Sequence, residues 1–171
     1  MTERPPGAPA ARFLVRRATL ADAAVLAAMR AASHSERYER DPVLVARFRA
    51  DCESFFSQEL AREDPFIRSW LALETGDPAR ALGTATMSLT PTLPRIVEPT
   101  PRLDARVRNV YVVPEARRRG IARELMRVLI EDVRTLGLKR LTLGTSSMGR
   151  PLYEAMGFHQ KEDEMIFELT G

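Results

Sequence analysis

The stretch Val110-Tyr-Val-Val-Pro-Glu-Ala-Arg-Arg-Arg-Gly-Ile-Ala-Arg123 decides the fold of this chain. It opens on apolar, strand-forming residues, a proline ends the strand, and an Arg/Gly turn leads into a helix. The first backbone N–H groups of a helix lack intrahelical partners and carry partial positive charge, so the junction predicts an anion-binding site. Gly120 lets the backbone come close to a ligand, and the three preceding arginines supply charge for a phosphate.

The spacing Arg117-x-x-Gly120-x-Ala122 resembles the (Gln/Arg)-x-x-Gly-x-(Gly/Ala) signature of the GNAT N-acetyltransferases, in which this loop wraps the pyrophosphate of acetyl-CoA. The apolar run from Tyr111 to Pro114 matches the family's habit of closing a strand on proline just before the loop. The resemblance therefore rests on a strand and a loop in the expected order.

A second segment supports the same resemblance. Residues 146–158 resemble the family's Asn-x-x-Ala-x-x-x-Tyr-Glu-x-x-Gly-Phe segment, with Ser146 and Gly149 in place of Asn and Ala. Tyr153 and the Gly-Phe pair that ends the segment stay in register. The resemblance is specific over residues 105–158 and architectural before them.

The resemblance implies an α/β (α+β) fold, with one GNAT-like domain whose mixed sheet of six to seven strands is flanked by about four helices. It implies an enzyme that transfers an acetyl group from acetyl-CoA, as acyl-donor co-substrate, directly to a primary amine of a small molecule or protein, with no metal. The residues that it places at the cofactor are Tyr111, Val112, Val113, Arg118, Arg119, Gly120, Ile121, Ala122, Arg123 and Ser146.

Family members bind pantetheine through a strand that bulges away from its neighbour. Carried over to this chain, the main chain of Tyr111 and Val113 would bind pantetheine, and the N–H of Val112 or Val113 would be the oxyanion donor. Tyr153 takes the general-acid position, where a phenol can protonate the leaving thiolate. The alternative for Tyr153 is packing against the cofactor or the core.

The general base and the acceptor stay open at this stage. Glu74, Glu98 and Asp104 are candidate bases only because they lie in or beside strands and a proline loop expected to border the acceptor, and the favoured alternative for each is a solvated surface charge. The segment joining the first two helices helps form the acceptor site in such enzymes, which implies that role for residues that are otherwise ordinary surface loop residues: His34, Ser35, Glu36 and Tyr38. Arginines around a proline-rich loop favour an acceptor with a carboxylate or phosphate, or else reach the cofactor's 3′-phosphate or face water; they are Arg95, Arg102, Arg106 and Arg108.

Composition bounds the remaining functions. The 171 residues suit one domain, and 26 Lys+Arg against 23 Asp+Glu give a net charge of +3, too small to predict a nucleic-acid partner. One cysteine, Cys52, excludes an internal disulfide and is expected to be a buried apolar residue, and two distant histidines give no metal-ligand spacing. No apolar run approaches a membrane span, so we expect a cytoplasmic protein with no membrane partner. Family precedent makes a homodimer possible.

Periodicity predicts a flexible leader over residues 1–11 and one acyl-CoA N-acyltransferase domain over 12–171. A capping box, Thr19 to Asp22, introduces a first helix that ends near residue 33, and Asp41-Pro42 begins a second with an apolar stripe. A helix over 119–136 follows the Arg/Gly turn. Strands are expected over 13–17, 66–74, 81–89, 105–113 and 138–145, from 158 onward and over 165–169. Trp70, in the second of these strands, is expected to be core. Residues 90–104 are expected to be irregular, because Pro91 and the prolines that follow it cannot pair in a central strand.

Two rival functions remain. The first is a catalytically inactive acyl-CoA-binding sensor or interaction protein, which would keep the pocket and lose turnover. The second is a nucleic-acid module that uses arginines on phosphates, and it is disfavoured because aromatic residues do not interleave with these arginines. The arginines in question are Arg106, Arg108, Arg117, Arg118, Arg119 and Arg123.

Overall fold

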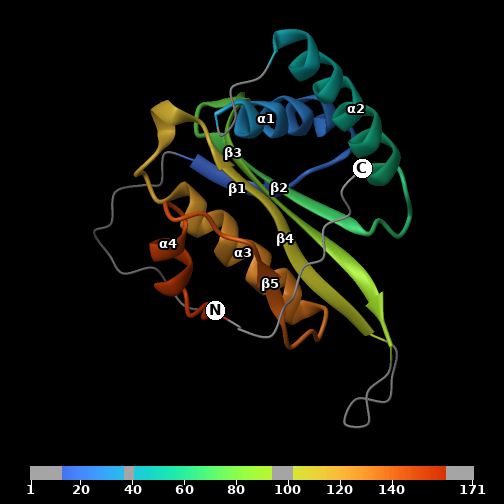
Figure 1. The fold of residues 1–171 in the computed structure, drawn as a ribbon, viewed down its shortest axis with the longest axis vertical. Helices are drawn as coiled ribbons and strands as arrows, with labels where there is room; N and C mark the ends of the chain where they lie inside the picture. Colours follow the sequence, from blue (N-terminus) through green and yellow to red (C-terminus); the bar gives the residue numbers. More distant parts are fainter. Residues whose placement is uncertain (1–12, 37–40, 94–101, 161–171) are drawn as a thin grey trace.

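The computed structural model describes residues 13–36, 41–93 and 102–160, which form one open sheet with helices on both faces (Figure 1). The strands, adjacent in chain order across the sheet, are β1 (Phe13–Arg17), β2 (Ile67–Glu74), β3 (Asp77–Thr92), β4 (Arg102–Val112) and β5 (Leu141–Leu143). The helices are α1 (Ala23–Ser35), α2 (Pro42–Leu60), α3 (Ile121–Thr135) and α4 (Arg150–Glu154). Strands β1 to β4 are antiparallel, and β5 is parallel to β4.

The predicted fold class and the four helices are confirmed, and the described residues carry five strands. Residues 158–160 are irregular, and the last predicted strand, over 165–169, lies outside the described residues, as does the predicted leader. No described helix has the length and apolar character needed to cross a membrane.

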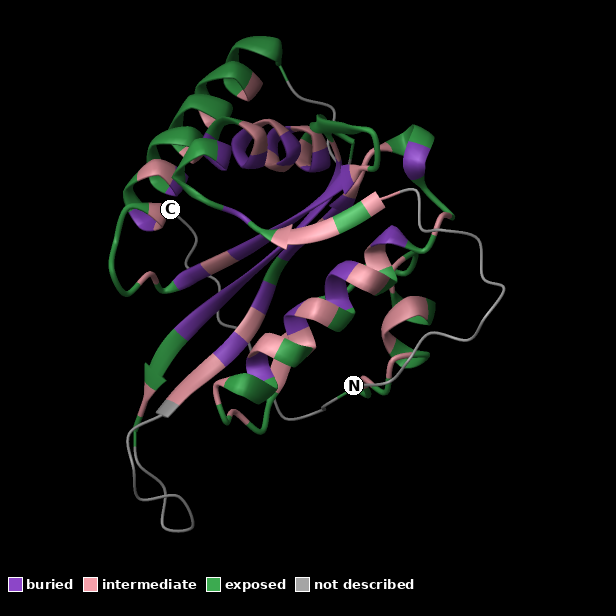
Figure 2. Ribbon diagram, turned by 180° about the vertical axis from the view of Figure 1, so that it is seen from behind, coloured by how far each residue is buried: buried purple, intermediate pink, exposed green. Residues whose placement is uncertain are grey.

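Two apolar clusters hold the layers together. Helix α3 buries Leu125 and Leu129 against the sheet face that carries Trp70, which confirms the prediction that this tryptophan is core. On the other face, α1 packs Leu26 against Leu71 of β2. Figure 2 shows the buried residues concentrated on the strands and on the inner sides of α1 and α3, whereas most of α2 is exposed.

The predicted helix boundaries have visible physical causes. The Asp41 carboxylate accepts a hydrogen bond from the N–H of Val43 at 2.8 Å and caps α2. The carboxylate of Asp22 accepts from the Thr19 N–H at 2.7 Å, and two nitrogens of Arg16 hold it at 2.7 and 2.8 Å. The box opens a short 3₁₀ turn over residues 20–22, and α1 follows it directly.

The expected apolar stripe of α2 is confirmed in part. Phe56 is buried in the cluster under α1, and Cys52 and Leu60 pack against that cluster half-buried. Phe55, the alternative to Phe56 in the predicted stripe, is exposed. Burial raises the pKa of the Cys52 thiol, which suits a packing role rather than a nucleophile.

The long hairpin of β3 and β4 corrects both ends of the irregular segment predicted over 90–104, whose middle, residues 94–101, lies outside the described residues. β3 continues to residue 92, β4 begins at 102, and Pro91 lies opposite Leu103 in the ladder. The N–H of Leu89 points to the Phe66 carbonyl beside β2, so the ring nitrogen of Pro91, two residues on, faces the same side after β2 has ended. The proline therefore removes no ladder hydrogen bond.

Candidate functional site

The sheet divides between its last two strands. Ala105 to Val107 of β4 pair with the whole of β5, and beyond that point no described strand pairs with this side of β4. The expected strand over 138–145 is thus shorter than predicted. A bulge sits at the same place, because Asn109 is opposite Thr86 while Val107 is opposite the next residue of β3. The rest of β4 is left with one edge facing an open split.

The Arg/Gly turn lies at the end of this split, where α3 begins. Arg118 and Gly120 have positive φ values of 63° and 81°, and Gly120 is the N-cap of α3 with no side chain capping the helix. Among the described residues, the backbone N–H groups of Gly120, Ile121, Ala122 and Arg123 donate no hydrogen bond within the protein. These are the four donors that a helix start leaves unsatisfied, and they suit an anion.

The backbone of β4 alternates between β3 and the split. The N–H of Val113 donates to the carbonyl of Leu82 at 3.0 Å, and a Cβ built on Gly83 would lie 2.7 Å from the carbonyl oxygen of Tyr111. Tyr111 and Val113, the two residues expected to bind pantetheine, therefore direct their main chain to β3. Val112, between them, directs its main chain into the split and is the remaining candidate oxyanion donor.

A hydrogen-bonded network joins the end of α1 to the turn. The hydroxyl of Tyr111 donates to one oxygen of Glu36 at 2.6 Å, and Arg117 pairs with the other oxygen. Arg117 also donates through Nε to the Val112 carbonyl at 3.0 Å, and its guanidinium lies 6.0 Å from the centre of the Tyr111 ring. Glu36 is 75 positions from Tyr111 and 81 from Arg117 in the chain, so no local pattern in the sequence predicted its place in the network.

The same contacts set the ionisation of this network. Burial raises the pKa of the Glu36 carboxyl, but the hydrogen bonds from Tyr111 and Arg117 outweigh it and hold that pKa below its ordinary value. Burial, together with the bond to Glu36, raises the pKa of the Tyr111 hydroxyl to about 12. Glu36 is therefore a carboxylate and Tyr111 a neutral phenol at neutral pH.

The candidate general bases are placed unequally. Glu74 accepts from Arg80 at 2.6 Å, and its other oxygen lies 3.6 Å from a nitrogen of Arg119 in the turn, so it is engaged with two cations. Asp104 is half-buried on β4, opposite Thr90 and away from the split. Glu98 lies outside the described residues.

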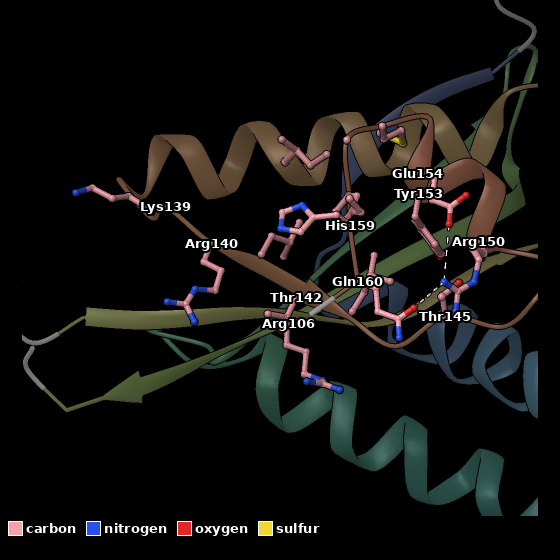
Figure 3. Close-up of a pocket in the computed structure, with 16 residues that line it drawn as sticks. Arg106, Lys139, Arg140, Thr142, Thr145, Arg150, Tyr153, Glu154, His159 and Gln160 are labelled. Carbon is pink, nitrogen blue, oxygen red and sulfur yellow. Dashed lines mark hydrogen bonds and ion pairs between the residues drawn. The ribbon is translucent and has the colours of Figure 1, made fainter. Parts of the chain in front are cut away.

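Tyr153 lies on α4, beside a pocket of about 720 Å³ that runs along β5 (Figure 3). Its ring packs edge-on against Phe158, with the centroids 5.9 Å apart. None of the four unpaired N–H groups lines this pocket, which also reaches Gln160, the last described residue, so we place the candidate site at the split rather than in the pocket. Ser146 is exposed and its Oγ accepts from the N–H of Gly149 at 3.3 Å, ordering the turn before α4.

The model of the "Acetyltransferase (GNAT) family" matches residues 26–158, most of the chain. The chain belongs to this family. Solved structures with low sequence identity to this chain have the same fold. A predicted acetyltransferase of Clostridium acetobutylicum, solved with acetyl-CoA, superposes with a TM-score of 0.76 at 20% identity, covering 91% of this chain and 96% of that one.

Two further GNAT-like structures agree. A GCN5-related N-acetyltransferase of Ralstonia eutropha JMP134 has a TM-score of 0.76 at 24% identity, with 93% of this chain and 99% of that chain covered. A ribosomal-protein-alanine N-acetyltransferase of Brucella melitensis biovar Abortus 2308 has a TM-score of 0.65 at 20% identity, with 92% and 99% covered. A comparison with curated protein sequences finds no match.

Proposed function

We propose that the chain is an N-acetyltransferase that moves an acetyl group from acetyl-CoA directly to a primary amine of a small molecule or protein. The observation that carries the proposal is the set of four unpaired N–H groups at the start of α3, next to the split between β4 and β5. Membership of the GNAT family and the acetyl-CoA in the structure from Clostridium acetobutylicum support the same donor.

The residues present fit this donor. The N–H groups of residues 120–123 would bind its pyrophosphate, and the exposed side chains of Arg118 and Arg123 are near enough in the chain to add charge. A Cβ at Gly120 would meet no atom within 4 Å, so the turn is open to a ligand. Pantetheine would lie along the free edge of β4.

The chemistry then falls to two residues. Attack of a neutral amine on the thioester carbonyl moves negative charge onto its oxygen, which the N–H of Val112 would stabilise. The C–S bond breaks as the amide forms, and the hydroxyl of Tyr153 would protonate the departing thiolate. Besides lining the pocket along β5, Tyr153 packs against the core cluster that includes Ile121 at the start of α3, which supports this role. The amine must lose a proton on the way, and water carries that proton from the open split to solvent in this proposal.

The test is release of free CoA thiol from acetyl-CoA in the presence of a panel of primary amines and lysine peptides, with acetylated products identified by mass spectrometry. We expect release of CoA thiol that depends on the amine and is matched by one acetylated product. Tight binding of acetyl-CoA with no turnover on the whole panel would contradict it and favour an acyl-CoA-binding sensor instead.

A further inference from the structure

Buried polar side chains form a row across the sheet face that α1 covers. Ser69, Thr86 and Asn109 lie directly opposite one another on β2, β3 and β4, with exposed fractions of 0%, 4% and 8%. The hydroxyls of Ser69 and Thr86 are 2.9 Å apart. Burying a polar group costs free energy unless it is hydrogen-bonded, so these side chains rely on partners in the row and on α1, and they give this face a polar floor.

Two arginines donate hydrogen bonds to side chains at the β4 end of this row. From α1, Nη1 of Arg30 donates to Oδ1 of Asn109 at 3.2 Å. From the bulge in β4, Nε of Arg108 donates to Oγ of Ser88 at 2.7 Å. Ser88 is buried and stands two residues along β3 from Thr86, the partner of Asn109, so Ser88 and Asn109 are roughly 7 Å apart.

The positive charge of Arg108 is not balanced by an ion pair with any described residue. Its side chain is exposed, and no carboxylate of the described residues pairs with it. The bond to Ser88 uses one N–H of a guanidinium that has five, and fixes its direction without neutralising it. An oriented, uncancelled guanidinium over a polar floor is suited to a carboxylate or a phosphate.

Arg108 and its neighbours lie apart from the proposed acetyl-CoA site. Arg108 and Asn109 lie where β4 leaves β5, on the face toward α1, whereas the four unpaired N–H groups begin α3, which packs on the opposite face. An anion held at Arg108 is therefore a different group from the pyrophosphate held at α3. It would approach the split from the side opposite α3.

We propose that Ser88, Asn109, Arg30 and Arg108 form an anion subsite for the acceptor, so that the acetylated amine carries a carboxylate or a phosphate. This inference rests on the proposed function and deepens it by naming the class of acceptor. The anion binds to the guanidinium of Arg108 with Arg30 beside it, and the amine of the same molecule extends into the split toward the thioester.

The experiment compares acceptors that differ only in the anion, at saturating acetyl-CoA. An amino acid is paired with its primary amide, and phosphoethanolamine with ethanolamine, which separates the carboxylate from the phosphate source. We expect kcat/KM to be about tenfold or more higher for the anionic member of at least one pair, the worth of a hydrogen bond to a charged group. Equal or better use of both neutral members overturns the inference while leaving the proposed function intact.

Arg108→Gln and Arg134→Gln make a matched pair of variants. Arg134 is exposed on α3 and pairs with Glu131, so its replacement makes the same charge change away from the site. Arg108→Gln should remove the preference for the anionic acceptor by raising KM for that acceptor much more than for its neutral partner, and Arg108→Lys should restore part of the preference. An equal loss on both acceptors, or an equal effect of Arg134→Gln, contradicts the assignment.

A binding measurement tests the subsite even if the protein acetylates none of these amines, a result that would contradict the proposed function. Calorimetry on the CoA-loaded protein measures binding of each pair directly. Binding of an anionic member but not its neutral partner, lost in Arg108→Gln, supports the subsite without catalysis. Absence of binding by both anionic members overturns it.

Discussion

At the scale of single residues, the donor site depends on backbone geometry at Gly120. Its φ of 81° lies in the left-handed region, where a residue with a Cβ pays a conformational cost even though no atom is in the way. Gly137, behind α3, has a φ of 69° and the same open surroundings but lies at the other end of the helix. The two glycines therefore separate a backbone effect from a ligand effect.

We expect Gly120→Ala and Gly137→Ala each to lower the free energy of unfolding by about 1 kcal/mol. Gly120→Ala should also weaken acetyl-CoA binding, because its turn presents the N–H groups that bind the pyrophosphate. Chemical denaturation and calorimetric titration of both variants check this. Equal acetyl-CoA affinities in the two variants would show that the turn is not the donor site.

Tyr153 permits a test of acid catalysis that keeps the packing. In Tyr153→Phe the ring can still pack against Phe158, and only the hydroxyl is lost. We expect kcat to fall by about 100-fold, the lower range for a positioned general acid, with acetyl-CoA affinity unchanged. Full turnover by the variant on an accepted amine would leave Tyr153 a packing role alone.

At the scale of elements, the capping box before α1 makes stability depend on pH. The hydrogen bonds from Arg16 are the main cause that lowers the pKa of Asp22 to about 2, against a raising effect of burial. A lowered folded-state pKa stabilises the fold above the ordinary carboxyl pKa, and this contribution is lost as pH falls from there toward 2.

Asp22→Asn should accordingly lower the free energy of unfolding by about 2 kcal/mol at neutral pH. The gap between variant and parent should close as pH falls through the range from about 4 to about 2. Asp51→Asn, an exposed carboxylate on α2, is the control and should change stability by less than about 0.5 kcal/mol at every pH. A gap that stays constant with pH would contradict the role of the charge.

The link between α1, β4 and the turn is tested through Tyr111. Glu36→Gln removes a negative charge that helps raise the pKa of the phenol to about 12, so the pKa should fall, yet stay above that of an ordinary tyrosine because burial is the larger cause. Ultraviolet titration of tyrosinate measures it, with Glu131→Gln on α3 as the control. An unchanged titration curve would mean that Glu36 does not hold Tyr111 in solution.

At the scale of the whole molecule, the sequence predicted the strand, turn and helix at 110–135, because proline, glycine and apolar period act locally there. It also predicted Trp70 as core and Asp41 as a cap, which the structure confirms. The prediction that Pro91 lies in an irregular segment was wrong. The cost of a proline in a strand depends on whether a neighbouring strand is present, and that is a property of the assembled sheet.

The candidate site was less predictable for the same reason. A period of two tells which residues share a face of a strand but not which edge their backbone groups serve. It therefore does not show that the main chain of Tyr111 and Val113, to which the resemblance assigns pantetheine, is directed to β3, whereas that of Val112 faces the split. The bonds of Arg30 to Asn109 and of Arg117 to Glu36 join residues about 80 positions apart. No motif in one sequence encodes them.

The most direct test of the donor site is a thermal-shift titration with acetyl-CoA and CoA, with ATP as the control nucleotide. A ligand that binds only the folded state raises its stability by mass action, about 2.7 kcal/mol at a concentration 100 times the dissociation constant. We expect a saturable rise in Tm with both CoA species and little change with ATP. No shift at millimolar acetyl-CoA, or an equal shift with ATP, would contradict the assignment of the turn and split as an acetyl-CoA site.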